Sequence, residues 1–152
     1  MQYVIVGVGG TNFYARTPDE AYATLVLDTL LAPSAANLRT ALQTLSELGF
    51  LFQAGGEPFL DAQDEPTLQA IVKNGATPAA RDASGTEIDL LLSISGFSYG
   101  DIAKDAVTFR GSGTDVRVGS LEKLLRSQEA SGRPKDRIFL QLLAARSEDD
   151  EA

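Results

Sequence analysis

The chain has 152 residues, of which 43% are hydrophobic and 22% are charged, and its formal net charge is −8. It contains no cysteine and no histidine, which excludes disulfides, metal sites built from thiolates or imidazoles, and catalysis by a histidine. The acidic balance argues against a broad surface for nucleic-acid phosphates. No apolar run reaches the roughly 20 residues of a membrane span, and residues 1–6 do not resemble a signal peptide. We therefore expect a cytoplasmic protein that does not enter membranes.

The length suits one domain, which we expect over residues 1–146, followed by an acidic and disordered tail over 147–152. Up to residue 75, the hydrophobic pattern predicts seven elements in chain order. They are a strand over 2–6, a Gly-Gly turn over 7–10, a short helix over 11–15, an apolar strand over 23–31, an amphipathic helix over 33–48, a strand over 50–53 and a helix over 65–73.

The rest of the chain predicts two β-hairpins and three helices. Ala83-Ser84-Gly85 and Gly111-Ser112-Gly113 separate short apolar runs, which is typical of hairpins. A short helix is expected over 99–105, and Ser120 and Pro134 begin two further helices. We expect the last two helices to pack on the sheet through Leu121, Leu124, Leu125, Phe139 and Leu142. Hairpins and a central strand among helices predict an α+β fold with a small mixed β-sheet and flanking helices.

Two aspartates lie in strands that are otherwise apolar. Asp28 ends the apolar run that begins at Thr24, and Asp89 lies in the run over residues 88–92. A buried charge without a partner is expensive, so such carboxylates must find hydrogen-bond donors or a cation. Each could accept backbone hydrogen bonds at a strand end, or both could line one site. We expect them on adjacent strands and on the same face, beside a cleft that Gly9-Gly10 closes.

Gly9-Gly10 precedes Thr11, which lies near the expected N-terminus of the first short helix. A glycine turn at a helix start can bring backbone N–H groups close to phosphates, and it can equally be a structural turn. Both interpretations are open from the sequence.

Basic residues offer a second pair of interpretations. Arg133 and Lys135 flank Pro134 at the expected start of the last helix. They could bind phosphate, or Arg133 could simply pair with a carboxylate on the surface, while Pro134 and Asp136 stabilise the helix start. Arg81, in the first hairpin, either is solvated or faces the site.

Several of these motifs occur together in one known superfamily. The order of Tyr3-Val4-Ile5-Val6-Gly7, then Gly9-Gly10, then Thr24 and Asp28 is similar to the nucleotidyltransferase superfamily. The stretch over 116–136, which ends in Gly-Arg-Pro-Lys-Asp, resembles the closing segment of small bacterial nucleotidyltransferase-like proteins related to abortive-infection toxins. The resemblance covers most of the chain.

This resemblance implies a nucleotidyltransferase-like fold and a site for a nucleoside triphosphate with Mg²⁺. In such proteins two or three carboxylates hold Mg²⁺ ions that bridge the phosphates and activate an acceptor hydroxyl. The resemblance makes Asp28 and Asp89 the metal ligands and catalytic residues. It assigns nucleotide binding to four residues, which are Gly9, Gly10, Thr11 and Thr24.

Two departures from the family pattern weaken the expected chemistry. Val26 stands where the family has its first aspartate, and Gln128 stands where many members carry a lysine. We therefore expect weak Mg²⁺-nucleotide binding, with transfer absent or very slow. Candidates for a further carboxylate are Glu57, Asp61 and Glu87, of which we expect Glu87 to face away from Asp89.

Two alternatives to this function stay open from the sequence. One is a non-catalytic module on the same fold that binds a ligand or a protein partner. The other is an α+β domain in which the two aspartates are structural.

Overall fold

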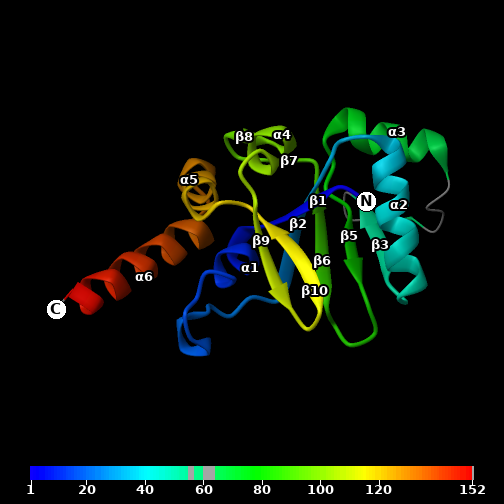
Figure 1. Cartoon of the computed structure of the whole chain (residues 1–152). Helices are drawn as coiled ribbons and strands as arrows, with labels where there is room; N and C mark the ends of the chain where they lie inside the picture. The colour runs from blue at the N-terminus through cyan, green and yellow to red at the C-terminus, as the bar shows by residue number, and fades with distance from the viewer. Residues whose placement is uncertain (55–56, 60–63, 152) are drawn as a thin grey trace.

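A computed structural model describes residues 1–54, 57–59 and 64–151 of the chain. In this part of the chain, eight strands form one mixed sheet in the order β4-β3-β5-β6-β2-β1-β10-β9, and β7 and β8 form a separate ribbon (Figure 1). The strands are β1 (Tyr3–Val6), β2 (Val26–Leu31), β3 (Leu51–Ala54), β4 (Glu57–Phe59), β5 (Ala79–Arg81), β6 (Glu87–Leu91), β7 (Ser93–Ile94), β8 (Phe97–Ser98), β9 (Val107–Gly111) and β10 (Thr114–Val118).

The centre of the sheet combines two parallel pairings with antiparallel ones. β2 lies between β1, to which it is antiparallel, and β6, to which it is parallel. β1 is in turn parallel to β10, and the two expected hairpins, β5 with β6 and β9 with β10, are both formed. The prediction of a mixed sheet with flanking helices is therefore confirmed. Because side chains alternate between the two faces of a strand, the register decides which residues of β2 and β6 share a face.

Several helices begin or end at residues with recognisable capping chemistry. The Ser34 and Ser120 hydroxyls accept hydrogen bonds from backbone N–H groups of α2 and α5. Gly75 and Gly132 end α3 and α5 in the left-handed conformation, with φ of 63° at both. The helices are α1 (Gly7–Asn12), α2 (Ala35–Glu47), α3 (Glu65–Asn74), α4 (Tyr99–Ala103), α5 (Leu121–Ser131) and α6 (Pro134–Glu151), with a 3₁₀ turn over Pro18–Glu20.

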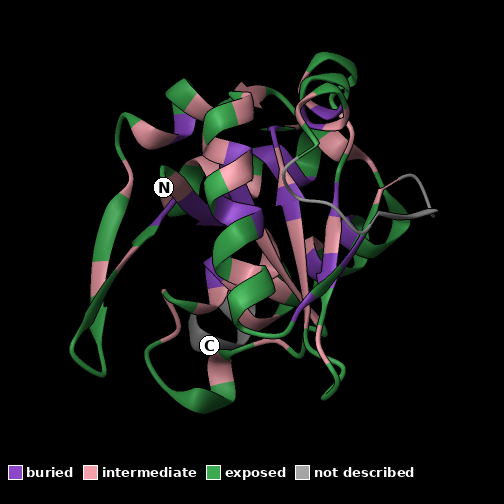
Figure 2. Cartoon of the chain, turned by 90° about the vertical axis from the view of Figure 1, so that its right-hand side faces the viewer, coloured by how far each residue is buried: buried purple, intermediate pink, exposed green. Residues whose placement is uncertain are grey.

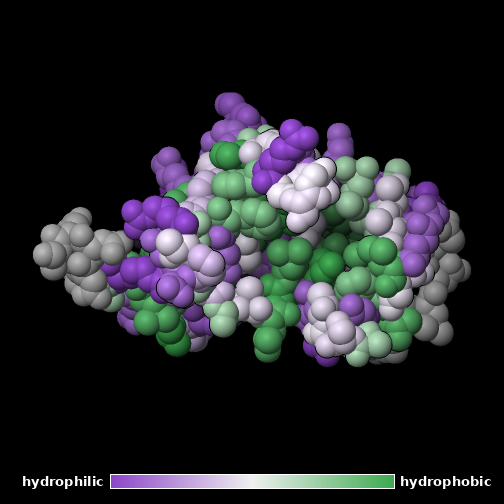
Figure 3. All heavy atoms as spheres, turned by 60° about the horizontal axis from the view of Figure 1, so that its bottom comes forward, coloured by the Kyte–Doolittle hydropathy of each residue, from purple (hydrophilic) through white to green (hydrophobic). Residues whose placement is uncertain are grey.

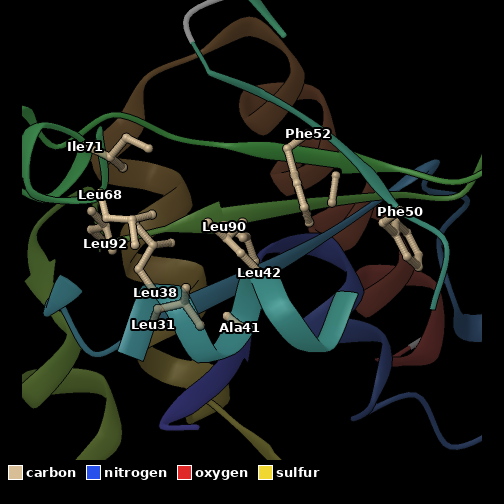
Figure 4. Packing of buried hydrophobic residues seen from close by; sticks show 11 residues of the cluster. Leu31, Leu38, Ala41, Leu42, Phe50, Phe52, Leu68, Ile71, Leu90 and Leu92 are labelled. Atoms are coloured by element: carbon tan, nitrogen blue, oxygen red, sulfur yellow. The ribbon is translucent and has the colours of Figure 1, made fainter. Parts of the chain in front are cut away.

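Buried apolar residues form two clusters, which β2 separates by sending Leu31 into one and Leu30 into the other. The first cluster joins α2 and α3 to the sheet, with Leu38 and Leu42 of α2 packed beside Leu90 (Figure 4). The second lies around β1 and includes one buried residue each from α4 and α5. Burial is concentrated in the sheet and on the helix faces turned toward it (Figure 2). The sheet is thus covered on both faces.

The structure differs from expectation at both ends of the chain. Residues 7–10, for which we expect a turn, are already the first residues of α1. The strand expected from residue 23 begins at Val26, after an exposed segment that includes Leu25. The early start of α1 has a local cause, because Gly7 takes a positive φ that lets the chain enter a helix directly from β1.

Helix α6 corrects a second expectation, because it packs on α5 and extends away from the sheet (Figure 1). Phe139 is buried, but Ile138 and Leu142 are 57% and 53% exposed. Our expectation that α6 packs on the sheet through Leu142 is therefore wrong. On α5, Leu124 joins the core as expected, whereas Leu121 is partly exposed. The acidic segment for which we expect disorder is helical up to Glu151.

One face of the surface has an apolar middle. Figure 3 shows apolar residues that reach the surface across the middle of one face, between hydrophilic side chains on either side. Within the described residues, no helix has both the length and the apolar character that crossing a membrane requires.

We expect Leu124→Ala to lower the free energy of unfolding by about 2–5 kcal/mol, the usual cost of a cavity in a packed core. Leu124 is 1% exposed and belongs to the cluster around β1. Leu121→Ala, in the same helix but at a residue that is 37% exposed, is the matched control and should cost clearly less. Urea denaturation measures both. Equal losses for the two variants would show that α5 is not anchored through Leu124.

Candidate functional site

The two aspartates singled out in the sequence are direct neighbours across the centre of the sheet. In the parallel pairing of β2 with β6, Asp28 lies opposite Asp89, and Val26 lies opposite Glu87. Neighbouring strands are about 4.8 Å apart, and residues paired in register project to the same face. The expectation that Asp28 and Asp89 occupy adjacent strands on one face is confirmed, and we refer to them below as the carboxylate pair.

Both members of the carboxylate pair line a cleft of about 1070 Å³. Its walls include the junction of β1 with α1, the segment before β2, the strands β2 and β6, helix α5 and the start of α6. These parts are far apart in the sequence. Representative lining residues, one from each wall, are Gly7, Thr24, Asp89, Gln128 and Lys135.

Burial and mutual repulsion make the carboxylate pair hard to ionise. Desolvation raises the pKa of Asp28, although Lys135 and Arg133 partly oppose the rise. Desolvation is the main cause that raises the pKa of Asp89 to about 6. A hydrogen bond with Glu87 and the negative charges of Glu87 and Asp28 add to this rise. Within the described residues, Oδ1 of Asp89 is buried and has no hydrogen-bond partner. The pair is therefore a site that a bound cation would stabilise.

Gly7 is a site residue that sequence reasoning missed. Its φ is +68°, and a Cβ placed on it would lie 2.4 Å from Oδ2 of Asp28. The backbone of Gly7 therefore approaches the carboxylate as closely as only glycine permits. The signal in the sequence is a glycine directly after an apolar strand, a pattern that also predicts a turn.

Gly9, Gly10 and Thr11 are not among the residues that line the cleft, so the expectation that Gly9-Gly10 closes it is wrong. A Cβ on Gly9 would meet Leu27, and one on Gly10 would meet Leu124 and the carbonyl of Ile5. The Thr11 hydroxyl donates a hydrogen bond to the carbonyl oxygen of Val8 in the preceding turn. These residues let α1 pack closely on the core, which is the structural interpretation of the glycine turn.

Thr24, the remaining residue assigned to the nucleotide, does line the cleft. Its hydroxyl donates a hydrogen bond to the carbonyl oxygen of Val26, 2.9 Å away. This contact shapes the backbone just before β2. Thr24 is close enough to the site to touch a ligand in the cleft, while its hydroxyl already has a local partner.

The start of α6 brings cations to the cleft. Asp136 is buried and accepts hydrogen bonds from Nε of Arg133 and from the Ser131 hydroxyl. Arg133 therefore pairs with a carboxylate, as one interpretation expects, but the carboxylate is buried and not on the surface. Lys135 is exposed, lines the cleft and acts electrostatically on both members of the carboxylate pair. The two interpretations of Arg133 are therefore compatible, because its paired side chain still borders the cleft.

Helix α6 and the segment before β2 hold one another in place. The ring of Tyr22 meets that of Phe139 edge-on at 4.8 Å between centroids, and the Arg146 guanidinium lies 4.3 Å from the centroid of Tyr22. Arg146 also donates a hydrogen bond to the carbonyl oxygen of Glu20. These contacts fix a wall of the cleft that the sheet itself does not support.

Of the three candidates for a further carboxylate, Glu87 is the one whose side chain the structure describes. Asp61 and the side chain of Glu57 lie outside the described residues. Glu87 shares a face with Asp89, because residues two apart in a strand point the same way, so the expectation that it faces away is wrong. Glu87 also forms an ion pair with Arg81, which places Arg81 on this face beside the site.

No group of three acidic, histidine or cysteine side chains that could hold a metal ion occurs in the described parts of the chain. A metal at the carboxylate pair would therefore depend on oxygen atoms from its ligand to complete its coordination. Comparisons with models of protein families and with curated proteins find no match to this chain.

We expect Gly7→Ala to be strongly destabilising and to displace the Asp28 carboxylate. A positive φ costs a non-glycine residue about 1–2 kcal/mol, and the contact with Asp28 adds to that cost. Gly113→Ala isolates the backbone contribution, because Gly113 has φ of +76° with nothing within 4 Å of the added Cβ. Denaturant unfolding of both variants measures the difference. If Gly7→Ala cost no more than Gly113→Ala, the close approach of Gly7 to Asp28 would be refuted.

The raised pKa of Asp89 predicts how stability depends on pH. In the folded protein the Asp89 carboxyl group stays protonated up to about pH 6, whereas an ordinary aspartate has a pKa of 3.8. The stabilisation that comes from this protonation is therefore complete below about pH 4. That stability is lost as the pH rises through about 6. We therefore expect Asp89→Asn to stabilise the protein relative to the unaltered chain at pH 7.5, and to do so less at pH 4.

Asp82→Asn is the control, because we expect it to destabilise the protein at neutral pH, whereas Asp89→Asn stabilises it. Hydrogen bonds from Ser84 and Thr86 lower the pKa of Asp82, so its stabilising effect is present at neutral pH and lost in acid. Thermal unfolding across the pH range measures both variants. A stabilising effect of Asp89→Asn that did not change with pH would contradict the assigned burial of this carboxyl group.

Proposed function

We propose that the cleft binds a nucleoside triphosphate together with Mg²⁺, on a nucleotidyltransferase-like fold with a degenerate active site. The observation that carries the proposal is the carboxylate pair, two half-buried aspartates in register on neighbouring parallel strands of the central sheet. The cleft is large enough for a nucleotide, since ligand sites commonly measure about 300–1,000 Å³. The proposal also implies a cytoplasmic protein, because that compartment supplies both components.

Three features of the carboxylate pair fit Mg²⁺. Carboxylate oxygens are ligands that Mg²⁺ prefers, and it is commonly bound through one or two of them plus substrate phosphates. Oδ1 of Asp89 is buried without a hydrogen-bond partner in the described structure. Gly7 leaves room for the Asp28 carboxylate where any side chain would collide with it. When bound, Mg²⁺ would neutralise charge on the pair and on the phosphates.

Phosphate binding is supported by the cations at the start of α6. Lys135 and Arg133 both border the cleft and both act electrostatically on Asp28. Positive side chains on one wall and a carboxylate pair in the same cleft suit an anionic ligand that carries its own divalent cation. The ligand would thus complete a coordination shell that the described side chains do not fill.

Transfer of the nucleotidyl group is expected to be absent or very slow. Val26 lies on the same face as Asp28, lines the cleft and offers no ligand atom. Two-metal transfer needs enough negative ligands to hold two divalent ions close together. The carboxylate pair supports one such ion, while Glu87 is engaged by Arg81.

A non-catalytic partner module on the same fold is the second candidate. It is favoured by Ile138 and Leu142, which are exposed on α6 and border the cleft. Apolar side chains at the mouth of a cleft are typical of a surface that a partner covers. This candidate predicts protein binding without any dependence on Mg²⁺.

Calorimetric titration of Mg²⁺ with each nucleoside triphosphate tests the proposal. We expect weak binding that requires Mg²⁺ and that falls at least about tenfold in Asp28→Asn and Asp89→Asn, since even outer partners of metal ligands are worth roughly 10–100-fold in affinity. Val26→Asp, which adds a carboxylate on the face of Asp28, should tighten Mg²⁺ binding. Asp115→Asn, a change at an exposed residue of the β9–β10 hairpin, is the control and should bind as the unaltered protein does.

Two results would contradict parts of this proposal. Binding that is unchanged in Asp28→Asn and Asp89→Asn would remove the carboxylate pair from the site. Robust transfer of a radiolabelled nucleotide by the unaltered protein, lost in Asp28→Ala, would show that the enzyme is active despite Val26.

A further inference from the structure

Gln128 presents an unsatisfied amide beside the cleft. It lies on α5, lines the cleft and is 6% exposed. Among the described residues, neither its Nε2 nor its Oε1 has a hydrogen-bond partner. The hydroxyl of Tyr22, on another wall of the same cleft, is also buried without one. Buried polar side chains are normally paired, so each such group requires an explanation.

Packing alone does not explain this amide. An apolar side chain of similar length would fill the same volume without leaving a donor and an acceptor unpaired, which is the costly outcome for a buried polar group. The terminal torsion of glutamine is soft, so the amide can turn toward a group in the cleft without moving α5. A ligand in the cleft can therefore supply the missing partners.

The chemistry of an amide narrows the ligand group. Gln128 offers a donor at Nε2 and an acceptor at Oε1 in one plane. A phosphate can use only the donor, and a metal ion only the acceptor. A nucleobase edge has a donor beside an acceptor and satisfies both, as in the paired contacts of glutamine with adenine.

We propose that Gln128 recognises the base of the nucleotide through a paired hydrogen bond, with the Tyr22 hydroxyl, on another wall of the cleft, as a second polar contact. This inference rests on the proposed function and assigns different parts of the nucleotide to different parts of the cleft. The carboxylate pair and Lys135 hold the charged part of the ligand, and the amide of Gln128 holds the base.

Binding of Mg²⁺-tripolyphosphate, which has no base, is compared with binding of the four Mg²⁺-nucleoside triphosphates. In the unaltered protein, at least one nucleotide should bind about tenfold or more tightly than tripolyphosphate, the effect expected of one good paired contact. Gln128→Met, which keeps the length of the side chain and removes both hydrogen bonds, should abolish that advantage and leave tripolyphosphate binding unchanged. Gln43→Met, at an exposed residue of α2, is the matched control.

Each outcome bears on a different claim. If nucleotides and tripolyphosphate bind equally to the unaltered protein, or if Gln128→Met weakens both alike or neither, base recognition by Gln128 is overturned and the phosphate site stands. If neither ligand binds, the proposed function fails and this inference fails with it.

A measurement on the unaltered protein covers the case in which Gln128→Met does not fold. The side-chain NH₂ resonances of Gln128, assigned by triple-resonance NMR, should shift when a free nucleoside is added, and should shift less with tripolyphosphate. Shifts confined to other residues would overturn the proposal.

Discussion

Two aspartates that face each other across a pair of parallel strands are the constraint on which the cleft depends. Asp28 and Asp89 lie in the middle of the sheet, where burial weakens their hydration and each charge raises the cost of the other. The surroundings accommodate this cost in two ways. Gly7 leaves space for the Asp28 carboxylate, and Lys135 provides opposite charge from the start of α6. A core built only for stability would place apolar residues at both positions, since these pack without a desolvation cost.

The cleft is enclosed by segments that the sheet does not support directly. Helix α6 packs on α5 and is held by Tyr22, whose ring contacts both Phe139 and Arg146. The segment before β2 and the last helix therefore form one wall together, and these contacts help to hold both of them in place. This arrangement also explains why Ile138 and Leu142 are exposed, because the stripe that they belong to faces the cleft and solvent instead of the sheet.

The polar groups of the cleft differ in chemistry, and each is suited to bind a different part of a ligand. The carboxylate pair favours a cation, Lys135 and Arg133 favour an anion, and the amide of Gln128 favours a group with a donor beside an acceptor. A nucleotide with its divalent ion combines all three features. In the proposed function, Val26 beside Asp28 is the position at which a further carboxylate ligand is missing.

Local sequence determined much of this protein. Turn triplets such as Ala83-Ser84-Gly85 placed the hairpins, Ser120 placed a helix start, and apolar strands with a single aspartate identified both members of the carboxylate pair, because these signals act over a few residues. Only the tertiary structure decided the remaining features, since they depend on contacts between distant segments. It turned Gly9-Gly10 toward the core and Gly7 toward the site, because α1 begins one residue after β1 ends. It also placed the last helix on α5, where the sequence pattern alone could not tell a neighbouring helix from the sheet as its packing partner.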